Sequence, residues 1–310
     1  MEKVNLEKLA EFERQLDLMQ PEGGPFGCRI VGYGELTAVM TLDALPGNVY
    51  KRISGFIAES EARSYAEAIG RYLQLLGERG ISAVPTTTEV IVGAAPVVYL
   101  IQPHLNSGRL GHFLLHTTSQ SELQGILEQV LDTLSSLLKR NRQINDGIEV
   151  AADAQLSNWY FPAEGGSPCL LDVGSPIFRI NGRMETYSGN IYRALPQPIR
   201  WAVRKLRMVE DYFLHYFDMK GLVFDILGNM IKENAENRLT EGLTYINSWL
   251  QNRPEWSDIG PVTGKAVRRF YWLDAVTLEL LLRVRRYNRF IHNRILKKRY
   301  DYILPGKIAR

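Results

Sequence analysis

The chain is poor in cysteine and has no long hydrophobic run. Its 310 residues include only Cys28 and Cys169, which lie in separate regions. Two thiols cannot build a disulfide framework or a cysteine-rich metal cluster, so a reducing cytoplasm is the expected compartment. The longest mostly apolar run, 90–101, is interrupted by Gly93 and Pro96 and is too short for a transmembrane helix. We find no internal repeat, no low-complexity linker and no secretory signal.

Charge is unevenly distributed along a chain of otherwise ordinary composition. The sequence is 45% apolar and 23% charged, with a net charge of +3. Residues 264–310 carry thirteen lysines and arginines against three acidic residues, which gives +10 and leaves −7 for the remainder. This end is either a solvated helix face or an anion-binding surface, with an anionic acceptor, an acidic partner or a membrane surface as candidates. Nucleic acid is disfavoured because no recognised nucleic-acid module accompanies the charge.

Apolar residues in this basic segment recur every three or four positions. The spacing predicts one buried stripe on a long helix, formed by Leu273, Val276, Leu280, Val284, Tyr287, Ile291 and Ile295. The basic residues predicted to face away from the stripe are Arg283, Arg286, Arg294 and Lys298. Neutralising Arg286, Arg294 and Lys298 should therefore weaken binding of an anionic acceptor or partner.

The first third of the chain predicts a small sheet with one internal helix. An acidic amphipathic helix comes first, within residues 1–19, and residues 45–48 are predicted as a turn. The predicted order is then strand, strand, strand, helix, strand, strand. The strands are expected within 29–42 (two, around the turn 32–35), 49–53, 90–93 and 97–101, and the helix at 58–76.

Beyond residue 102 the pattern becomes mainly helical. Ser119, with Glu122 three residues later, is typical of a helix start. The apolar face of that helix is predicted to be Leu123, Ile126, Leu127, Val130, Leu131, Leu134 and Leu138. A β-hairpin is predicted from the runs 159–161 and 169–171, and residues from 196 onward read mainly as helix.

Polar residues around this hairpin form the most informative pattern of the sequence. Asp153 and Asn158 stand five residues apart, and Asp172 follows the hairpin just before Val173 and Gly174. Asp and Asn often occur singly in turns. In this arrangement, however, two carboxylates and a carboxamide could surround a metal-bound phosphate, which indicates phosphoryl transfer.

This set, in this order of elements, resembles the protein-kinase-like fold and is nearer the aminoglycoside and choline kinases than the protein kinases. The resemblance implies an α+β, bilobal protein: a small N-lobe with an antiparallel five-stranded sheet and one helix, and a larger, mainly helical C-lobe. The N-lobe with its preceding helix would occupy 1–101 and the C-lobe 102–310. The motifs cover about residues 28–178.

The resemblance also implies roles for individual residues. Asp153 would be the catalytic base, and Asn158 with Asp172 would bind Mg²⁺. Gly32 and Gly34 resemble the glycine-rich loop over the phosphates, although Thr37 replaces a third glycine. Lys51 matches the strand lysine that contacts the phosphates of ATP.

The helix partner of Lys51 and the adenine site follow from the same resemblance. Glu67 is the expected ion-pair partner, with Glu61 as the alternative. Adenine should lie against the hinge 102–105. Pro103 has no N–H, so Gln102, His104 or the preceding isoleucine must donate.

Three departures from the family pattern affect the functional hypothesis. Ala151 and Ala152 replace a histidine-containing pair, Gln155 replaces a lysine or histidine that meets the transferred phosphate, and no Ala-Pro-Glu motif follows Asp172. We expect an ATP- and Mg²⁺-dependent phosphotransferase acting on a small molecule. The alternatives are a nucleotide-binding or scaffold protein that has lost transfer, and a nucleotidyltransferase. The sequence does not identify the acceptor.

Overall fold

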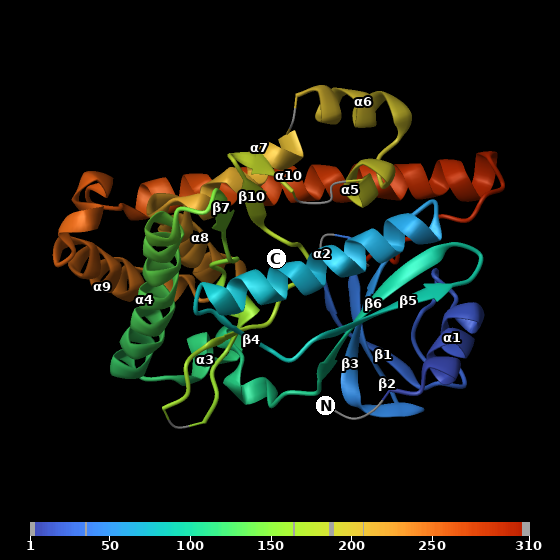
Figure 1. The fold of residues 1–310 in the computed structure, drawn as a ribbon, viewed down its shortest axis with the longest axis horizontal. Coiled ribbons are helices and arrows are strands. Elements are labelled where there is room, and N and C mark those ends of the chain that lie inside the picture. Colours follow the sequence, from blue (N-terminus) through green and yellow to red (C-terminus); the bar gives the residue numbers. More distant parts are fainter. Residues whose placement is uncertain (1–3, 35, 164, 186–188, 207, 306–310) are drawn as a thin grey trace.

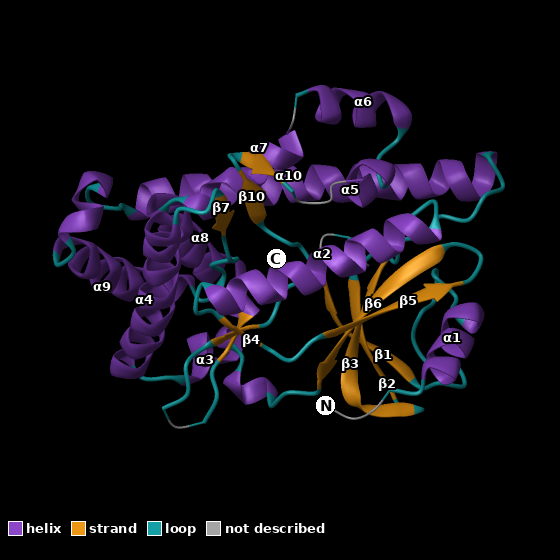
Figure 2. Ribbon diagram, viewed as in Figure 1, coloured by secondary structure: helices purple, strands orange, loops and turns teal. Residues whose placement is uncertain are grey.

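A five-stranded antiparallel sheet and a larger helical part make up the chain (Figure 2). The computed structural model describes residues 4–34, 36–163, 165–185, 189–206 and 208–305. The strand order is β1-β2-β3-β6-β5. The strands are β1 (Cys28–Tyr33), β2 (Ala38–Leu42), β3 (Leu45–Ile53), β5 (Thr87–Val92) and β6 (Pro96–Pro103). The predicted mixture of an antiparallel five-stranded sheet and a helical remainder is confirmed. The turn predicted at 45–48 is wrong, because these residues form the first half of β3.

Helices α1 (Leu6–Gln15) and α2 (Glu59–Glu78) pack on opposite faces of this sheet (Figure 1). Side chains alternate between the two faces along a strand. On β6, Tyr99 belongs to the hydrophobic cluster that contains α1, whereas Val98 belongs to the cluster that contains α2. Because both faces are covered, every residue of β6 from 96 to 101 is buried. This two-sided burial fixes the register of the neighbouring β3 and so the position of Lys51.

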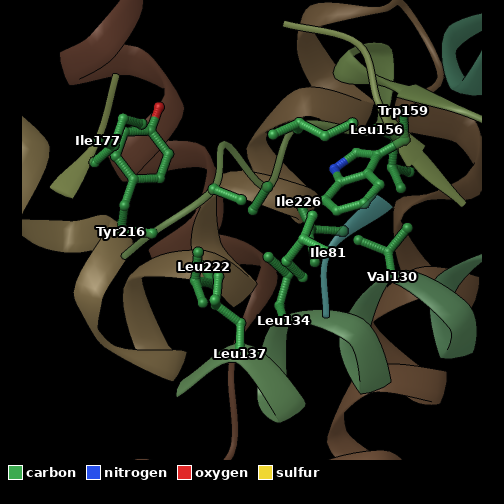
Figure 3. Close-up of a cluster of buried hydrophobic side chains, with 14 of the residues drawn as sticks. Ile81, Val130, Leu134, Leu137, Leu156, Trp159, Ile177, Tyr216, Leu222 and Ile226 are labelled. Atoms are coloured by element: carbon green, nitrogen blue, oxygen red, sulfur yellow. The ribbon is translucent and has the colours of Figure 1, made fainter. Parts of the chain in front are cut away.

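The predicted amphipathic helix after residue 119 is α4 (Gln120–Ile144). Ser119 and Glu122 form the predicted capping box, and every predicted apolar position on the helix is buried. Figure 3 shows Val130 and Leu134 of α4 packed toward Trp159 and Ile226. This core extends from the long helix to the segment that follows Asp153, so it holds that segment in place.

The remaining elements are short strands and further helices. The predicted hairpin is formed by β8 (Trp159–Tyr160) and β9 (Cys169–Leu170), and β4 (Ser82–Ala83) extends it in parallel. A second small sheet contains β7 (Ile148–Val150), β10 (Phe178–Ile180) and β11 (Arg183–Met184). The other α-helices are α3 (Gly111–Thr117), α5 (Gly189–Arg193), α6 (Gln197–Lys205), α7 (Met208–Leu214), α8 (Met219–Lys232), α9 (Leu239–Gln251) and α10 (Gly264–Phe290).

Short 3₁₀ segments and one π-helical segment complete the structure. They are η1 (Ser107–Arg109), η2 (Leu156–Asn158), η3 (His215–Phe217), η4 (Glu236–Arg238), η5 (Pro254–Ile259) and the π-helical η6 (Ile291–Ile295). After η6 the chain returns to the sheet, where Ile303 is buried in the cluster that contains α1. Within the described part of the chain, no helix combines the length and apolar character needed to span a bilayer.

The prediction of a buried apolar stripe on the last helix is wrong. Leu273, Leu280 and Tyr287 of α10 are exposed, as is Ile295 in η6. The helix instead packs on α8 through its other face, where Val267 and Leu282 are buried. Arg285 is fully buried on that packed face. The spacing of apolar residues identified one apolar face of the helix. The helix has a second apolar face, and it is this second face that packs on α8.

Candidate functional site

Lys51 and Asp172 meet although 121 residues separate them in the sequence. Lys51 lies on β3, and Asp172 follows β9 directly after the hairpin. The Lys51 Nζ to Asp172 Oδ1 distance is 2.6 Å, and both side chains are partly buried. The structure therefore brings together the strand lysine and the second carboxylate of the sequence pattern.

Gly174 allows this close approach. A Cβ at residue 174 would lie 3.1 Å from Lys51 Nζ and 3.3 Å from Asp172 Oδ1. The Gly174 N–H also donates to Asp172 Oδ1 over 2.9 Å. A larger residue would crowd both partners of the ion pair, so glycine at this position has a direct physical reason.

Asp153 is held beside this pair by the residues that follow it. The Gln155 N–H donates to Asp153 Oδ1 over 2.9 Å, and the Asn158 side chain lies close enough to lower the pKa of this carboxyl. Trp159, fully buried in the core, donates its Nε1–H to the Asp153 carbonyl over 3.0 Å. The predicted set of Asp153, Asn158 and Asp172 is thus gathered in one place.

The two aspartates differ electrostatically. Burial raises the pKa of Asp153, and the Asp172 carboxylate adds to the rise, while Gln155 N–H and the Lys232 ammonium reduce it. Burial also opposes ionisation of Asp172, but the Lys51 ammonium and the Gly174 N–H outweigh it and hold the pKa of Asp172 below its usual range. Asp172 is therefore the permanent anion, and Asp153 is the better proton acceptor.

Two tyrosines of α2 support the backbone around the aspartates. Tyr65 donates its hydroxyl to the Gly174 carbonyl, and Tyr72 donates to the Ala151 carbonyl over 2.7 Å. Seven residues separate the tyrosines, so they share one face of the helix. Ala151 itself is fully buried. The two tyrosines therefore hydrogen-bond the backbone beside Asp153 and Asp172. The methyl side chains of Ala151 and Ala152 cannot form such bonds.

Three side chains of α8 complete the cluster, and sequence reasoning missed all of them. Lys232 Nζ donates to Gln155 Oε1 over 2.7 Å, Gln155 Nε2 donates to Asp225 Oδ1 over 3.2 Å, and Asn229 Oδ1 accepts from the Ser157 N–H over 3.2 Å. The spacing of Asp225, Asn229 and Lys232 by four and three residues on a predicted helix was the available signal. It places one acid, one amide and one cation on a single face.

Asp225 is the most perturbed carboxyl of this cluster. Burial, and then repulsion from Asp153, raise its pKa well above the usual range. No described group hydrogen-bonds its Oδ2, which is buried. A small cavity beside Asp225 is lined also by Gln155 and Lys232, with Tyr271 and Asp274 from α10. A hollow of about 530 Å³ lies elsewhere, beside 181–184 and Glu210.

Glu67 is not brought to Lys51. It is exposed on α2, and in the described part of the structure no ion pair joins it to the lysine. The alternative, Glu61, pairs with Arg193 at 3.0 Å. The inward positions of the helix are taken by residues such as Tyr65, two positions from Glu67 and therefore on a different side.

The glycine turn and the hinge have simpler arrangements. Gly32 pairs with Val39 in the sheet, and the Gly34 N–H donates to the Thr37 carbonyl over 3.0 Å. The His104 N–H donates to the Gly47 carbonyl over 3.0 Å. Gln102 donates its side-chain amide to the Leu171 carbonyl over 2.8 Å, beside Asp172. Gln102 therefore links the end of β6 to the site.

The cluster lies within a region that a family model recognises. A family of unknown function (DUF6206) matches residues 29–253, more than half of the chain. The chain belongs to this family. The match contains Lys51, Asp153 and Asp172 and leaves out α1 and α10.

Other comparisons add little. No curated protein matches the chain. Among solved structures, a candidate aminoglycoside phosphotransferase from Ralstonia eutropha JMP134 gives a TM-score of 0.34 at 11% identity, covering 79% of this chain and 99% of its own. That likeness is too low to carry an argument, so the functional case depends on the geometry of the cluster.

Proposed function

We propose that this protein is an ATP- and Mg²⁺-dependent phosphotransferase with a two-lobed, protein-kinase-like fold. The observation that carries the proposal is the 2.6 Å contact between Lys51 and Asp172, with Asp153 and Asn158 beside it. A strand lysine, two loop carboxylates and a carboxamide are the groups that such enzymes use around ATP phosphates. The sheet with α2 would form the smaller lobe and the helices the larger, with a division near residue 102.

The residues present fit Mg²⁺. This ion prefers oxygen ligands and is commonly held by one or two carboxylates together with substrate phosphates. Asp172, ionised because of Lys51, and the Asn158 amide would hold it. Bound there, the ion would neutralise charge on the phosphates. Asp172 Oδ1 is already engaged by Lys51 and Gly174, and no described group hydrogen-bonds Oδ2.

The other groups would bind and orient the substrates. Lys51 would contact the phosphates of ATP, backbone N–H groups near Gly32 and Gly34 would cover them, and the adenine would lie beside 102–105, near Gln102 and His104. Asp153 would accept the proton of the attacking acceptor hydroxyl. Its raised pKa suits this role, because a base works best when its pKa approaches the operating pH.

Lys232 would supply the positive charge that Gln155 lacks. Its ammonium contacts the Gln155 amide and lies close enough to lower the pKa values of both Asp153 and Asp172. A cation in that position can stabilise negative charge on the transferred phosphate. We propose that Lys232, on α8, supplies the positive charge that enzymes of the resembling family carry at the position of Gln155.

A nucleotide-binding protein without transfer activity is the alternative. The observation that favours it is the exposed position of Glu67, which does not reach Lys51. The Lys51–Asp172 pair would also have to open before Lys51 could contact phosphate. A nucleotidyltransferase would use the same groups and would differ in which phosphate is attacked.

Binding and transfer can be tested separately. We expect Mg-ATP to raise the melting temperature, because a ligand at a hundredfold excess over its dissociation constant stabilises a fold by about 2.7 kcal/mol. ATP labelled on the γ or the α phosphate, incubated with a metabolite pool, should pass only the γ label to an acceptor. Transfer of the α label would indicate nucleotidyl transfer. No melting shift with ATP or GTP, with Mg²⁺ or Mn²⁺, would contradict nucleotide binding altogether.

Two aspartate variants distinguish an enzyme from a binding protein. Asp153→Asn should lower the transfer rate by about a hundred- to ten-thousandfold and leave nucleotide affinity nearly unchanged. Asp172→Asn should weaken the dependence of nucleotide binding on Mg²⁺. If the wild type binds nucleotide but neither variant differs from it, the carboxylates are structural and the account without transfer activity is the better one.

A further inference from the structure

The outward face of α10 is apolar. Six large side chains along the helix are each at least 46% exposed: Trp272, Leu273, Val276, Leu280, Tyr287 and Phe290. Single exposed apolar residues are normal on protein surfaces, but a contiguous set marks a contact site. We call this set the α10 face.

Helical geometry places these residues together. At about 100° per residue, the six lie within roughly a third of the helix circumference. The centre of that arc is opposite Val267 and Arg285, which are buried against the rest of the protein. The α10 face therefore points away from the body along nearly the whole helix.

Basic residues accompany the apolar ones. Arg269 and Arg283 are exposed and fall within the same arc, although Arg283 shares its charge with Glu279 through an ion pair of 2.9 Å. Arg294, Lys297 and Lys298 are exposed just beyond the helix. The face thus combines exposed apolar side chains with positive charge within and beyond it.

A second basic, amphipathic element lies on the same side of the molecule. In Figure 1, α10 runs along the upper edge and α6 projects beyond it. Trp201 of α6 is 65% exposed, and Lys205 lies over its ring at 4.8 Å from the centroid. Just after this helix, Leu206 is 64% exposed. Two elements therefore present tryptophan and aliphatic side chains next to cations.

We propose that the α10 face docks the protein on an anionic lipid bilayer, lying in the membrane surface without crossing it. Helices that lie on bilayers combine an apolar face containing Trp, Phe and Leu with lysine and arginine beside it. Each basic residue near an anionic surface contributes about 1 kcal/mol. A second copy of the chain is a poorer occupant, because a symmetric contact would bring two positively charged faces together.

Docking would bring the site close to the bilayer. The opposite face of α10 contributes Tyr271 and Asp274 to the small cavity beside Asp225 and Lys232. One helix diameter, about 10 Å, therefore separates the membrane surface from this cavity. The inference rests on the surface of α10 and holds whether or not the protein transfers phosphate.

Vesicle co-sedimentation of the whole protein tests the proposal. The probes are phosphatidylcholine vesicles with and without about 30% phosphatidylserine. We expect binding to the anionic vesicles only, and weaker binding at about 0.5 M salt. The variant Trp272→Ser/Leu280→Ser/Tyr287→Ser should lose at least about tenfold in affinity, since it removes three large apolar side chains.

A matched variant controls for general surface hydrophobicity. Val31→Ser/Ile57→Ser/Val92→Ser changes three residues that are 57%, 75% and 56% exposed and lie in or beside the sheet. It should bind vesicles like the wild type, and both variants should keep the wild-type circular dichroism spectrum. The proposal is overturned if the wild type does not sediment with anionic vesicles, or if both variants lose binding equally. It is also overturned if the α10 variant changes only the oligomeric state, which would identify a second copy as the occupant.

Discussion

Lys232 is a side chain whose removal should change how the site responds to pH. Its positive charge lowers the pKa of Asp153, so Lys232→Met should raise that pKa further. A base must be ionised to accept a proton, and the acidic limb of the transfer profile should therefore move to higher pH. Loss of charge near the phosphate should also lower the rate, by on the order of a hundredfold.

The measurement for Lys232 is the rate of γ-phosphate transfer against pH. Lys232→Arg keeps the charge and should restore the wild-type acidic limb. Lys139→Met removes an exposed lysine of α4 that pairs with Glu255 and should leave the profile unchanged. An acidic limb that stays in place in Lys232→Met would show that the lysine does not act on Asp153.

Asp225 makes a different prediction, about stability. Its pKa is raised in the folded protein, so the native state holds this proton more tightly than the unfolded chain does. The associated stability is complete at pH values below the ordinary Asp pKa and is lost as pH rises through the raised native pKa. Asp225→Asn removes the titrating group. The variant should therefore be less sensitive to pH and, at neutral pH, more stable by about 1 kcal/mol or more.

Urea unfolding of Asp225→Asn at several pH values checks this sign. Asp211→Asn, which changes an exposed aspartate in the first turn of α7, is the matched control and should change the unfolding free energy little. If Asp225→Asn is as sensitive to pH as the wild type, Asp225 is ionised in the native protein and has a partner at Oδ2.

Local spacing could group only the site residues that lie on one short segment, whereas Lys51 was assigned from the resemblance of its strand. Asp153, Asn158 and Asp172 surround a hairpin, so local spacing sufficed to group them. Lys232 and Asp225 reach the site by the packing of α8, and nothing in the local sequence indicates which helix packs there. The pairing of Lys51 with Asp172, in place of Glu67, depends on the exact rotation of α2 and on the space left by Gly174.

Helix α2 acts on the site through its tyrosines. Burial raises the pKa of Tyr72 well above its ordinary value, so its hydroxyl stays a donor to the Ala151 carbonyl. Tyr72→Phe would leave that carbonyl without this partner and should cost about 1–3 kcal/mol of unfolding free energy. Because Ala151 lies two residues before Asp153, the rate of transfer should fall as well.

Urea unfolding and transfer kinetics measure the two effects of Tyr72→Phe. Tyr287→Phe removes the hydroxyl of a tyrosine that is 61% exposed and should alter neither quantity. If Tyr72→Phe keeps the unfolding free energy and the transfer rate of the wild type, the Tyr72 hydroxyl does not support the backbone at Ala151.

Elements were predictable when one face was clearly apolar and the ends were marked. Helix α4 has a capping box and a single apolar face, and both were read correctly. Helix α10 carries apolar residues on two faces, so its periodicity could not decide which one is buried. The two-residue strand β4 has no periodicity of its own and exists because it pairs with β9. Its position depends on tertiary contacts that the local sequence does not contain.

At the scale of the whole molecule, the sheet and the helical part are joined by contacts between distant residues. Arg193 of α5 donates to the Gly55 carbonyl over 2.6 Å, and Tyr302 near the chain end donates to the Asn190 carbonyl over 2.7 Å. The sequence predicted that this part of the chain is mainly helical. It could not predict these two contacts, because each joins residues more than a hundred positions apart and no local pattern indicates which distant residues meet.

The buried ion pair of Glu13 and Arg52 joins α1, the sheet and the end of the chain. Arg52 Nε and Nη2 each donate to Glu13 over 2.8 Å, and Arg52 Nη1 donates to the Asp301 carbonyl over 2.7 Å. Tyr99 of β6 also donates to Glu13, over 2.7 Å. Both ionic side chains are almost fully buried, at 2% and 4% exposure. Removing Glu13 would leave the buried Arg52 guanidinium with the Asp301 carbonyl but without its carboxylate partner.

Glu13→Ala should therefore lower the free energy of unfolding by about 3–5 kcal/mol, measured in urea. Asp43→Ala breaks an ion pair with Arg29 of similar length, 2.7 Å, whose side chains are 59% and 67% exposed, and should cost about 1 kcal/mol at most. The double variant Glu13→Leu/Arg52→Met removes both buried charges and should recover much of the loss. Because Arg52 also holds the Asp301 carbonyl, trypsin should cleave after Arg299 faster in Glu13→Ala than in Asp43→Ala. Equal losses of stability in these two single variants would mean that burial does not strengthen the Glu13–Arg52 pair.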